Sequence, residues 1–446
     1  MDPQSIGIII TAATVILLLL RVPIAVVLAC AGYVGMTLIV ALQGGGFDIH
    51  AGLMTANSYL GRLPYSSTAE YTFTVIPMFL LMGYFATEGG FTKDIYDAAR
   101  LWLARVPAGL AVASTAGCAM FAAISGSSLA TAAAMGRMAV PEMLDRGYHK
   151  GLATGVVAAG GTLGAMIPPS ILMILYAIFT QQSIAKLFIA GVLPGLLSMA
   201  MYMIMVIIRA RLNPSLAPPV KEVVTTREKI RAVKKVWGMV LLIVVIVVGL
   251  YSGLFTPAEA GGIGAAVAFL LCVGARRISR KGVSGALGET LKNTSMLFAA
   301  IMGAYMVTSF TALSGIAGDL AHWATGLPVP GFVLIGLLSV LYIFLGMFMG
   351  SIEIMLLTLP VVIPIVQGLD YSLIWFGVLM VKYLEIGLIS PPVGLNCFII
   401  DSVVGKRVSL AEIFKGVLWF ILADLVTIVL LIAFPQISLF LPGLMS

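Results

Sequence analysis

Long apolar runs, each close to 20 residues, are the feature that most restricts how this chain can fold. A helix needs about 20 apolar residues to cross the roughly 30 Å hydrocarbon layer of a membrane. Such runs recur throughout the 446 residues, of which 60% are hydrophobic and only 10% charged, with a mean hydropathy of +1.09. The sequence therefore predicts an all-α, polytopic membrane protein without a water-soluble domain.

The apolar segments divide into clear spans and two regions that are harder to divide. The clear spans are predicted at 5–20, 23–41, 72–87, 151–180, 184–208, 236–254, 257–275, 293–312, 372–404 and 411–434. The first is expected to be a retained helix rather than a cleaved signal peptide, because Arg21 follows it and nothing basic precedes it. The two long regions are 107–143 and 330–366.

Basic residues predict which loops face the cytoplasm. Segment 209–235 holds eight Lys and Arg against two Glu, and segment 276–292 holds five more basic residues. With both segments inside, 107–143 and 330–366 must each enter and leave on one face. They are therefore predicted to be re-entrant helical hairpins, the first opening to the cytoplasm and the second to the outside. Both termini are then expected outside, and the net charge of +7 belongs to cytoplasmic loops rather than to a nucleic-acid interface.

The two halves of the chain resemble each other at an offset near 223 residues. Three pairs keep this offset: Gly164 with Gly387, Pro168 with Pro391 and Pro169 with Pro392. The span that opens the first half is predicted to run inward and its counterpart, 293–312, outward. The repeats are therefore antiparallel, and inverted repeats with broken helices and midplane sites are typical of secondary transporters.

The stretch "SGSS" at Ser125 to Ser128 lies at the expected tip of the first hairpin. Irregular backbone at membrane depth is tolerated where it is buried in protein or lines a cavity. Each Pro-Pro pair breaks its helix, because proline lacks an amide donor. Two tips and two breaks are predicted to converge and to offer oxygen ligands to a hard cation such as Na⁺. For the tip alone, close helix packing by small residues remains an alternative.

Three ionisable residues lie near the second hairpin tip and the second helix break, at a membrane depth where charges usually have a function. They are Glu353, Lys382 and Glu385. Lys382 and Glu385 lie three positions apart, so on a helix they are expected to pair with each other. Arg137 is interpreted as an anchor at the cytoplasmic interface. The four cysteines have no metal-like spacing and are expected to be small buried hydrophobes without disulfides: Cys30, Cys118, Cys272 and Cys397.

Four motifs carry a resemblance to a known family. They are "IPMFLLMGYFATEGG", "FAAISGSSLATAAAMGRMAVPEM", "GGTLGAMIPPSI" and "SPPVGLNCFI". In this order they resemble the large membrane subunit (M, DctM-like) of tripartite ATP-independent periplasmic (TRAP) transporters, from about Val75 to the C-terminal helix. The resemblance implies a multi-pass protein of the bacterial inner membrane with an elevator-type fold. It also implies Na⁺-driven uptake of small organic acids, with a small four-helix membrane subunit (Q) and a periplasmic substrate-binding protein (P) as partners.

The resemblance also implies site residues, and no organic cofactor. The first Na⁺ site would involve Ser125, Gly126, Ser127, Ser128, Gly161, Thr162 and Gly164. The second would involve Gly350, Ser351, Ser390, Pro391, Gly394 and Asn396. The organic acid would contact Ser128, Thr131, Pro168, Pro169, Ser170 and Asn396. The second tip, "MGSIE", departs from the family pattern more than the first.

The predicted organisation has five parts. Residues 1–106 hold N-terminal scaffold helices and a cytoplasmic arm helix at 91–106. Residues 107–180 form the first half of a transport domain, with a hairpin and a broken helix. Residues 181–329 supply central scaffold helices, basic loops and an outer arm helix at 315–327. Residues 330–404 form the second transport half, and 405–446 a C-terminal scaffold helix and tail. The segment 43–71 is expected outside, either as a partner contact or as an insertion.

Two other functions were compared with a transporter subunit. A self-sufficient Na⁺/dicarboxylate or anion carrier of related fold stays an alternative, which uptake by the chain alone would favour. An intramembrane hydrolase or an ATP-driven pump is disfavoured, because the sequence has neither an HExxH motif nor a GxxxxGK[ST] loop. The chain is therefore not expected to be an enzyme.

Overall fold

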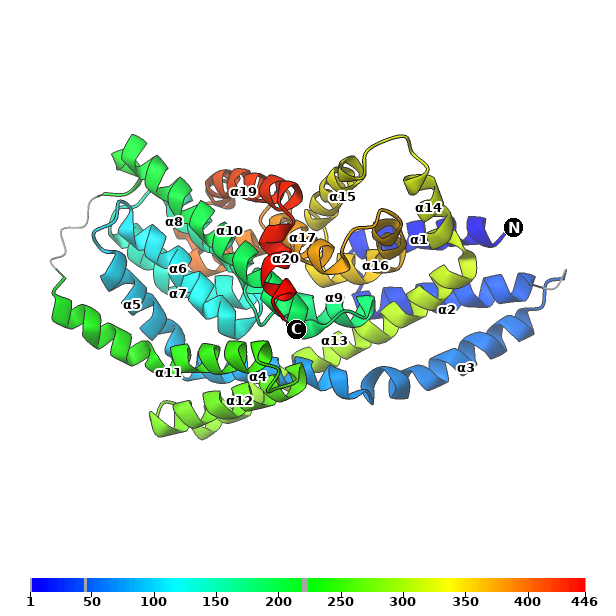
Figure 1. Ribbon diagram of the computed structural model, residues 1–446, viewed down its shortest axis with the longest axis horizontal. Helices are drawn as coiled ribbons and strands as arrows, with labels where there is room; N and C mark the ends of the chain where they lie inside the picture. Colours follow the sequence, from blue (N-terminus) through cyan, green and yellow to red (C-terminus); the bar gives the residue numbers. More distant parts are fainter. Residues whose placement is uncertain (1, 44–45, 219–223, 446) are drawn as a thin grey trace.

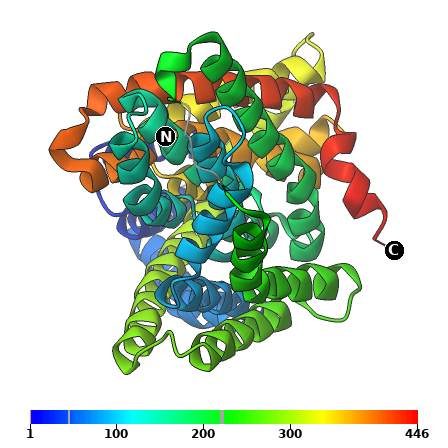
Figure 2. The ribbon, with the colours of Figure 1, turned by 90° about the vertical axis from the view of Figure 1, so that its left-hand side faces the viewer.

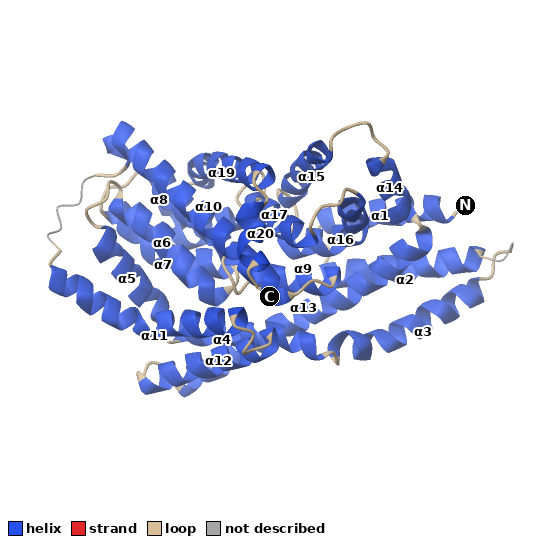
Figure 3. Ribbon diagram, in the orientation of Figure 1, coloured by secondary structure: helices blue, strands red, loops and turns tan. Residues whose placement is uncertain are grey.

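The computed structural model describes residues 2–43, 46–218 and 224–445. Within these residues every regular element is helical (Figure 3). Eight helices are long and apolar enough to cross a membrane, and a bent pair, 49–68 with 71–88, makes a ninth. The expected all-α polytopic fold is confirmed. Ser446, predicted outside, and Lys221 of the basic segment lie outside the described residues.

Two series of helices follow one another in the same order: an opening helix, a short arm, a hairpin, a broken helix and a long helix. The first series is α4 (Val75–Glu88), α5 (Phe91–Leu103), α6 (Gly109–Ser125), α7 (Ser128–Asp145), α8 (Lys150–Met166), α9 (Ile171–Thr180) and α10 (Ile184–Leu212). The second is α13 (Arg280–Ser314), α14 (Ile316–Thr325), α15 (Gly331–Gly346), α16 (Ser351–Gly368), α17 (Leu373–Gly387), α18 (Leu395–Val404) and α19 (Leu410–Ala433). The other α-helices are α1 (Pro3–Leu19), α2 (Ile24–Leu42), α3 (Ile49–Thr68), α11 (Thr226–Tyr251), α12 (Pro257–Gly274) and α20 (Gln436–Gly443).

The opening helices of the two halves run in opposite directions. Along α13, Asn293 donates a hydrogen bond to the Tyr84 hydroxyl at 2.7 Å. Farther on, Phe298 packs edge-on against Phe73, with ring centroids 6.0 Å apart. Near its end, Ser309 donates to the Tyr59 hydroxyl at 2.5 Å. Residues farther along α13 therefore contact residues that come earlier in α3 and α4. This means that α3 and α4 run antiparallel to α13, so the repeat is inverted.

Each predicted hairpin enters and leaves at one end. In the first, the Leu110 amide at the start of α6 donates to the hydroxyl of Tyr148, which follows α7, at 3.3 Å. In the second, the hydroxyls of Tyr342 and Thr358 meet across α15 and α16 at 2.7 Å. The α6–α7 hairpin occupies the left half of Figure 1 and α15–α16 the right half. Both are therefore antiparallel helical hairpins, as expected.

Both broken helices part at their Pro-Pro pair. The bonds Pro168–Pro169 and Pro391–Pro392 are cis. Just beyond each pair, an amide bonds back to the hairpin tip of its own half. Ile171 donates to the Gly126 carbonyl and Val393 to the Met347 carbonyl, each at 3.3 Å. Tip and break in each half are thus joined through backbone groups.

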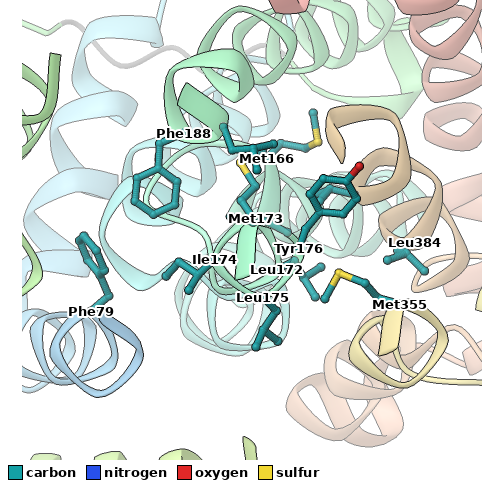
Figure 4. Close-up of a cluster of buried hydrophobic side chains, with 14 of the residues drawn as sticks. Phe79, Met166, Leu172, Met173, Ile174, Leu175, Tyr176, Phe188, Met355 and Leu384 are labelled. Carbon is teal, nitrogen blue, oxygen red and sulfur yellow. The ribbon is translucent and has the colours of Figure 1, made fainter. Parts of the chain in front are cut away.

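The short helix α9 lies at the centre of the main apolar core (Figure 4). Phe79 of α4 and Phe188 of α10 are on one side of it, with Met355 of α16 and Leu384 of α17 on the other. All four side chains are buried. The broken helix of the first half therefore packs against both an opening helix and the second hairpin.

Three helix starts follow from local sequence. Thr225, Thr256 and Ser409 each form a capping box with the Glu three positions later, so the first free amides of α11, α12 and α19 are satisfied. Seen from one end (Figure 2), α11, α12 and α13 lie along one side of the molecule, with α18 and α19 on the opposite side.

Two local expectations need correction. Most of segment 43–71, where the sequence predicted no helix, is the helix α3, capped by Asp48. Gly52 allows α3 to approach α2 closely, because a Cβ there would lie 2.2 Å from the Thr37 carbonyl oxygen. All four cysteines are free and three are buried, but Cys30 is exposed, since it lies on the outer face of α2.

Candidate functional site

One cavity of about 420 Å³ lies where the two hairpin tips meet the opening helices. The first tip contributes Ser125 to Ala130 and the second Gly350 to Glu353. Tyr84 and Thr87 of α4 and Asn293 of α13 line the other side. Among the described lining residues, Glu353 and Glu385 are acidic and none is basic. Elements from both halves thus line one cavity, which has a largely apolar wall and polar groups at the two tips.

The first tip is a two-residue break between α6 and α7. Gly126 has a left-handed backbone, with φ of +59°, and a Cβ there would lie 2.7 Å from the Pro169 carbonyl oxygen. Only glycine suits both conditions. Ser127 caps α7 by accepting from the Ala130 amide at 3.4 Å. The sequence "SGSS" therefore folds as a tight tip held against the first break.

The serine and threonine hydroxyls of this tip have specific partners. The hydroxyls of Ser125 and Thr131 are 2.8 Å apart, and Thr131 also donates to the Ser127 carbonyl at 2.8 Å. Ser128 donates to the carboxylate of Glu385 at 2.5 Å. Ser128 and Glu385 come from different halves, so this bond joins the first hairpin to the second broken helix.

Two glycines of α8 let the tip lie directly on the helix backbone. A Cβ at Gly164 would be 2.8 Å from the Ser127 carbonyl oxygen, and one at Gly161 would be 3.0 Å from that of Ser128. Thr162, between them, donates to the Ala159 carbonyl at 2.6 Å and meets the Tyr202 hydroxyl at 3.2 Å. Of the predicted first cation site, Gly161 and Gly164 therefore contact the tip, whereas the Thr162 hydroxyl is directed toward α10.

Asn396 also connects the two halves. It lies in the first turn of α18, is fully buried, and donates through Nδ2 to the Ala158 carbonyl of α8 at 3.0 Å. Its Oδ1 atom has no hydrogen-bond partner. The side chain predicted for the second site therefore lies beside the first broken helix, next to Gly161.

The second tip is built differently from the first. The Glu353 carboxylate accepts from the Gly350 amide at 2.9 Å and so caps α16. Ser351 is buried and its hydroxyl has no partner. In the second break, Ser390 bonds to its own helix at the Ile386 carbonyl, and Gly394 has a φ of +55°. The departure of "MGSIE" from the first tip thus places a carboxylate where the first tip has hydroxyls.

A buried ion pair lies beside the site. The Lys382 ammonium contacts Asp424 of α19 at 2.5 Å, and the Tyr202 hydroxyl of α10 donates to the other oxygen of Asp424 at 2.7 Å. Lys382 and Asp424 are fully buried. The expected Lys382–Glu385 pair is therefore wrong. Asp424 is the partner of Lys382, and Ser128 is the partner of Glu385.

The match to a family comes from residues 11–437, which fit the DctM component of tripartite ATP-independent periplasmic transporters. The chain belongs to the DctM family. Both hairpin tips and both Pro-Pro breaks lie within the matched residues, and the resemblance expected from the sequence motifs is confirmed.

Several relatives of this DctM protein carry transport names. The C4-dicarboxylate TRAP transporter large permease protein DctM of Pseudomonas aeruginosa is 37% identical over 85% of this chain and 88% of its own length. The namesake protein from Rhodobacter capsulatus is 31% identical over 92% and 98%. The sialic acid TRAP transporter permease SiaT of Haemophilus influenzae is 30% identical over 87% and 62%.

A solved structure shares the fold. The YdaH transporter of Alcanivorax borkumensis, whose crystal structure revealed an unusual topology, aligns with a TM-score of 0.59. The alignment covers 85% of this DctM chain and 89% of the YdaH chain, at 17% identity. At this identity the likeness concerns the fold alone.

The predicted site residues divide into two groups in this DctM protein. Those that line the cavity are Ser125, Gly126, Ser127, Ser128, Gly350 and Ser351. Those that are not among its lining residues are Thr131, Gly161, Thr162, Gly164, Pro168, Pro169, Ser170, Ser390, Pro391, Gly394 and Asn396. Thr131, Ser170 and Asn396 are fully buried. Among the described residues no group of three or more His, Cys, Asp or Glu gathers as for a transition metal.

Sequence reasoning missed two residues of the buried network, Tyr202 and Asp424. Asp424 carried a usable signal, because it is an acid inside the apolar span 411–434 and an intramembrane charge needs a partner. Tyr202 gave no such signal, since tyrosine is common in membrane segments.

Proposed function

We propose that this DctM protein is the transport subunit of a Na⁺-coupled importer of small organic acids. One observation carries the proposal: both hairpin tips and both opening helices line a single cavity, in which the tips supply hydroxyl and carboxylate groups within a largely apolar wall. The relatives named for C4-dicarboxylate and sialic acid, together with one named for isethionate, support an organic acid as cargo. A substrate there would touch elements of both halves at once.

The coupling ion follows from the charges around the cavity. An organic anion would enter a chamber with two carboxylates and no basic group among the described lining residues. Bound cations would offset this repulsion, and the hydroxyl and carbonyl oxygens at the tips suit a hard ion such as Na⁺. The two predicted Na⁺ sites remain part of this proposal, one at each tip and its break.

The movement proposed is an elevator. The hairpins and broken helices would slide as one body against α2, α4, α11, α12 and α13. Buried bonds of Thr162 and Lys382 tie α10 and α19 to the broken helices, through Tyr202 and Asp424 respectively. This supports α10 and α19 moving with that body, rather than with the scaffold to which the sequence assigned them.

The surroundings of the subunit are also part of the proposal. The chain would lie in a bacterial inner membrane with both termini periplasmic, where a periplasmic binding protein delivers the cargo. A small four-helix membrane subunit would complete the assembly. The end of α10 and the start of α11, which are rich in Arg and Lys and lie at the left in Figure 1, would then face the cytoplasm.

Uptake into proteoliposomes tests this function. The chain, co-purified with its membrane partner, is mixed with the binding protein and supplied with labelled succinate, sialic acid or isethionate. Uptake of one of them should follow an inward Na⁺ gradient and need no ATP. Ser127→Ala or Ser128→Ala should raise the Na⁺ concentration needed, whereas Ser402→Ala, at an exposed serine, should not. Equal uptake without Na⁺ would overturn the coupling, and uptake by the chain alone would favour the self-sufficient carrier.

A further inference from the structure

Glu385 is a buried carboxylate with only half of its hydrogen-bonding capacity used. It lies near the end of α17, is 1% exposed, and lines the cavity between the tips. Its Oε2 accepts the 2.5 Å bond from Ser128, but its Oε1 has no partner. Burying an ionised carboxylate costs several kcal/mol unless a cation or several donors compensate. Glu385 therefore lacks the compensating group that such a position requires.

The nearest basic side chain on the same helix is already engaged. Lys382 precedes Glu385 by three positions, but its ammonium is 2.5 Å from Asp424, with Tyr202 completing that pair. Because a buried ion pair is costly to break, Lys382 is held in place. No basic side chain is among the described residues that line the cavity, so a cation bound from solution is the charge that would compensate an ionised Glu385.

Further oxygens lie around the same point. Ser128 is bonded to Glu385, and its carbonyl oxygen lies against Gly161, where a Cβ would be 3.0 Å away. The Asn396 amide lies at the same glycine, its nitrogen 3.0 Å from that Cβ position, and its Oδ1 is buried without a partner. A carboxylate, an amide oxygen, a hydroxyl and a carbonyl thus gather from both halves. Hard cations take oxygen ligands of these kinds.

We propose that Glu385 is the anionic ligand of a Na⁺ site shared by the two halves, with Ser128 and Asn396 beside it. The inference rests on the proposed Na⁺-coupled function, but it differs from the two sites that pair each tip with its own break. Here the first tip and the second broken helix act together. Na⁺ on Glu385 would neutralise the chamber for an anionic cargo and hold α7 against α17.

If this site exists, Na⁺ must be bound at Glu385 before the hairpins and broken helices can slide through the membrane. A bare carboxylate carried through the membrane interior is strongly unfavourable, whereas a carboxylate paired with Na⁺ is close to neutral. The empty carrier would therefore be hindered from sliding with Glu385 ionised, and loss of Na⁺ would be coupled to loss of cargo.

The test measures Na⁺ binding without transport. The purified chain in detergent is heated at constant ionic strength in NaCl or KCl, and the Na⁺ dependence of the melting temperature is recorded. Glu385→Gln keeps an acceptor for Ser128 but removes the charge. The matched control is Glu70→Gln, which removes an exposed carboxylate outside the cavity. The Na⁺ concentration for half of the stabilisation should rise at least about tenfold in Glu385→Gln and stay unchanged in Glu70→Gln.

Each outcome has a distinct meaning. If the wild-type chain shows no Na⁺-specific stabilisation, the Na⁺ coupling proposed above fails. If the wild-type chain responds and Glu385→Gln responds identically, the shared site is wrong while Na⁺ coupling stands. Should Glu385→Gln not fold, Asn396→Ala supplies the answer, because it removes one oxygen and leaves all charges in place. An unchanged Na⁺ response in that variant would likewise overturn the shared site.

Discussion

Lys382 of α17 and Asp424 of α19 form a fully buried ion pair, with Nζ and Oδ1 2.5 Å apart. Removing one partner leaves the other charge buried and uncompensated, which typically costs about 3–5 kcal/mol. Lys382→Met and Asp424→Asn should therefore each lower the melting temperature strongly. The double variant should be more stable than the sum of the two losses predicts, because no unpaired charge remains.

The exposed pair of Arg407 and Asp145 provides the control for this comparison. Its side chains are 49% and 65% exposed, so Arg407→Ala should change the free energy of unfolding by at most about 1 kcal/mol. Thermal unfolding of the four variants in one detergent measures both effects. If the loss of stability in the double variant equals the sum of the losses in Lys382→Met and Asp424→Asn, the two residues do not form the ion pair described here.

Gly126 is predicted to be the least replaceable residue of the first tip. Alanine there would adopt a left-handed backbone, at a cost of roughly 1–2 kcal/mol, and would also push against the Pro169 carbonyl. Gly126→Ala should therefore lower the melting temperature and separate the tip from the break. Gly288→Ala is the control, because Gly288 lies in mid-helix with open space around it, and alanine should stabilise the helix by up to about 1 kcal/mol. Equal melting temperatures for the two variants would show that the tip is not constrained.

The repeats and hairpins could be predicted because they rest on features that are explicit in the sequence. The paired positions Pro168 and Pro391 mark the breaks, and the basic segments require the two apolar regions to return to the same face. Contacts between side chains that are far apart in the sequence were harder to predict. Lys382 was paired with Glu385 because helical spacing allows it, but Asp424, 42 positions away, lies closer. The helix α3 was missed because it contains Pro64 and many polar residues, so neither hydropathy nor propensity indicates it.

The orientation of the first hairpin gives a direct labelling prediction. The Leu110 amide and the Tyr148 hydroxyl are bonded, so the segments before α6 and after α7 lie at one end of the molecule. Single cysteines at Arg105 and Lys150 should both react with an impermeant thiol reagent in inside-out vesicles, together with one at Ser215. A cysteine at Ser446 should react in right-side-out cells. Labelling of Arg105 and Lys150 from opposite faces would exclude a re-entrant hairpin.

Crosslinking along α4 tests the elevator itself. Ile76, Leu80, Gly83 and Thr87 follow one another at helical spacing on one face of α4, and the last three line the cavity opposite Leu129 of the first tip. Ile76 lies eleven residues before Thr87, about 16 Å along the helix.

If the hairpin slides as part of a rigid body, Leu129 changes its depth while α4 stays fixed. A cysteine at Leu129 should therefore crosslink to one at Thr87 in one condition and to one at Ile76 in another, with Na⁺ and cargo shifting the ratio. Leu80, which lies between Ile76 and Thr87, is the intermediate control. A cysteine there should crosslink to Leu129 through a short reagent while the hairpin moves, but it should not be the main crosslink in either end state. Crosslinks confined to Thr87 under every condition, with uptake intact in the crosslinked protein, would exclude sliding. The cavity would then open by local movement of the tips, because a body that changes depth by several helical turns cannot keep one partner on a fixed helix.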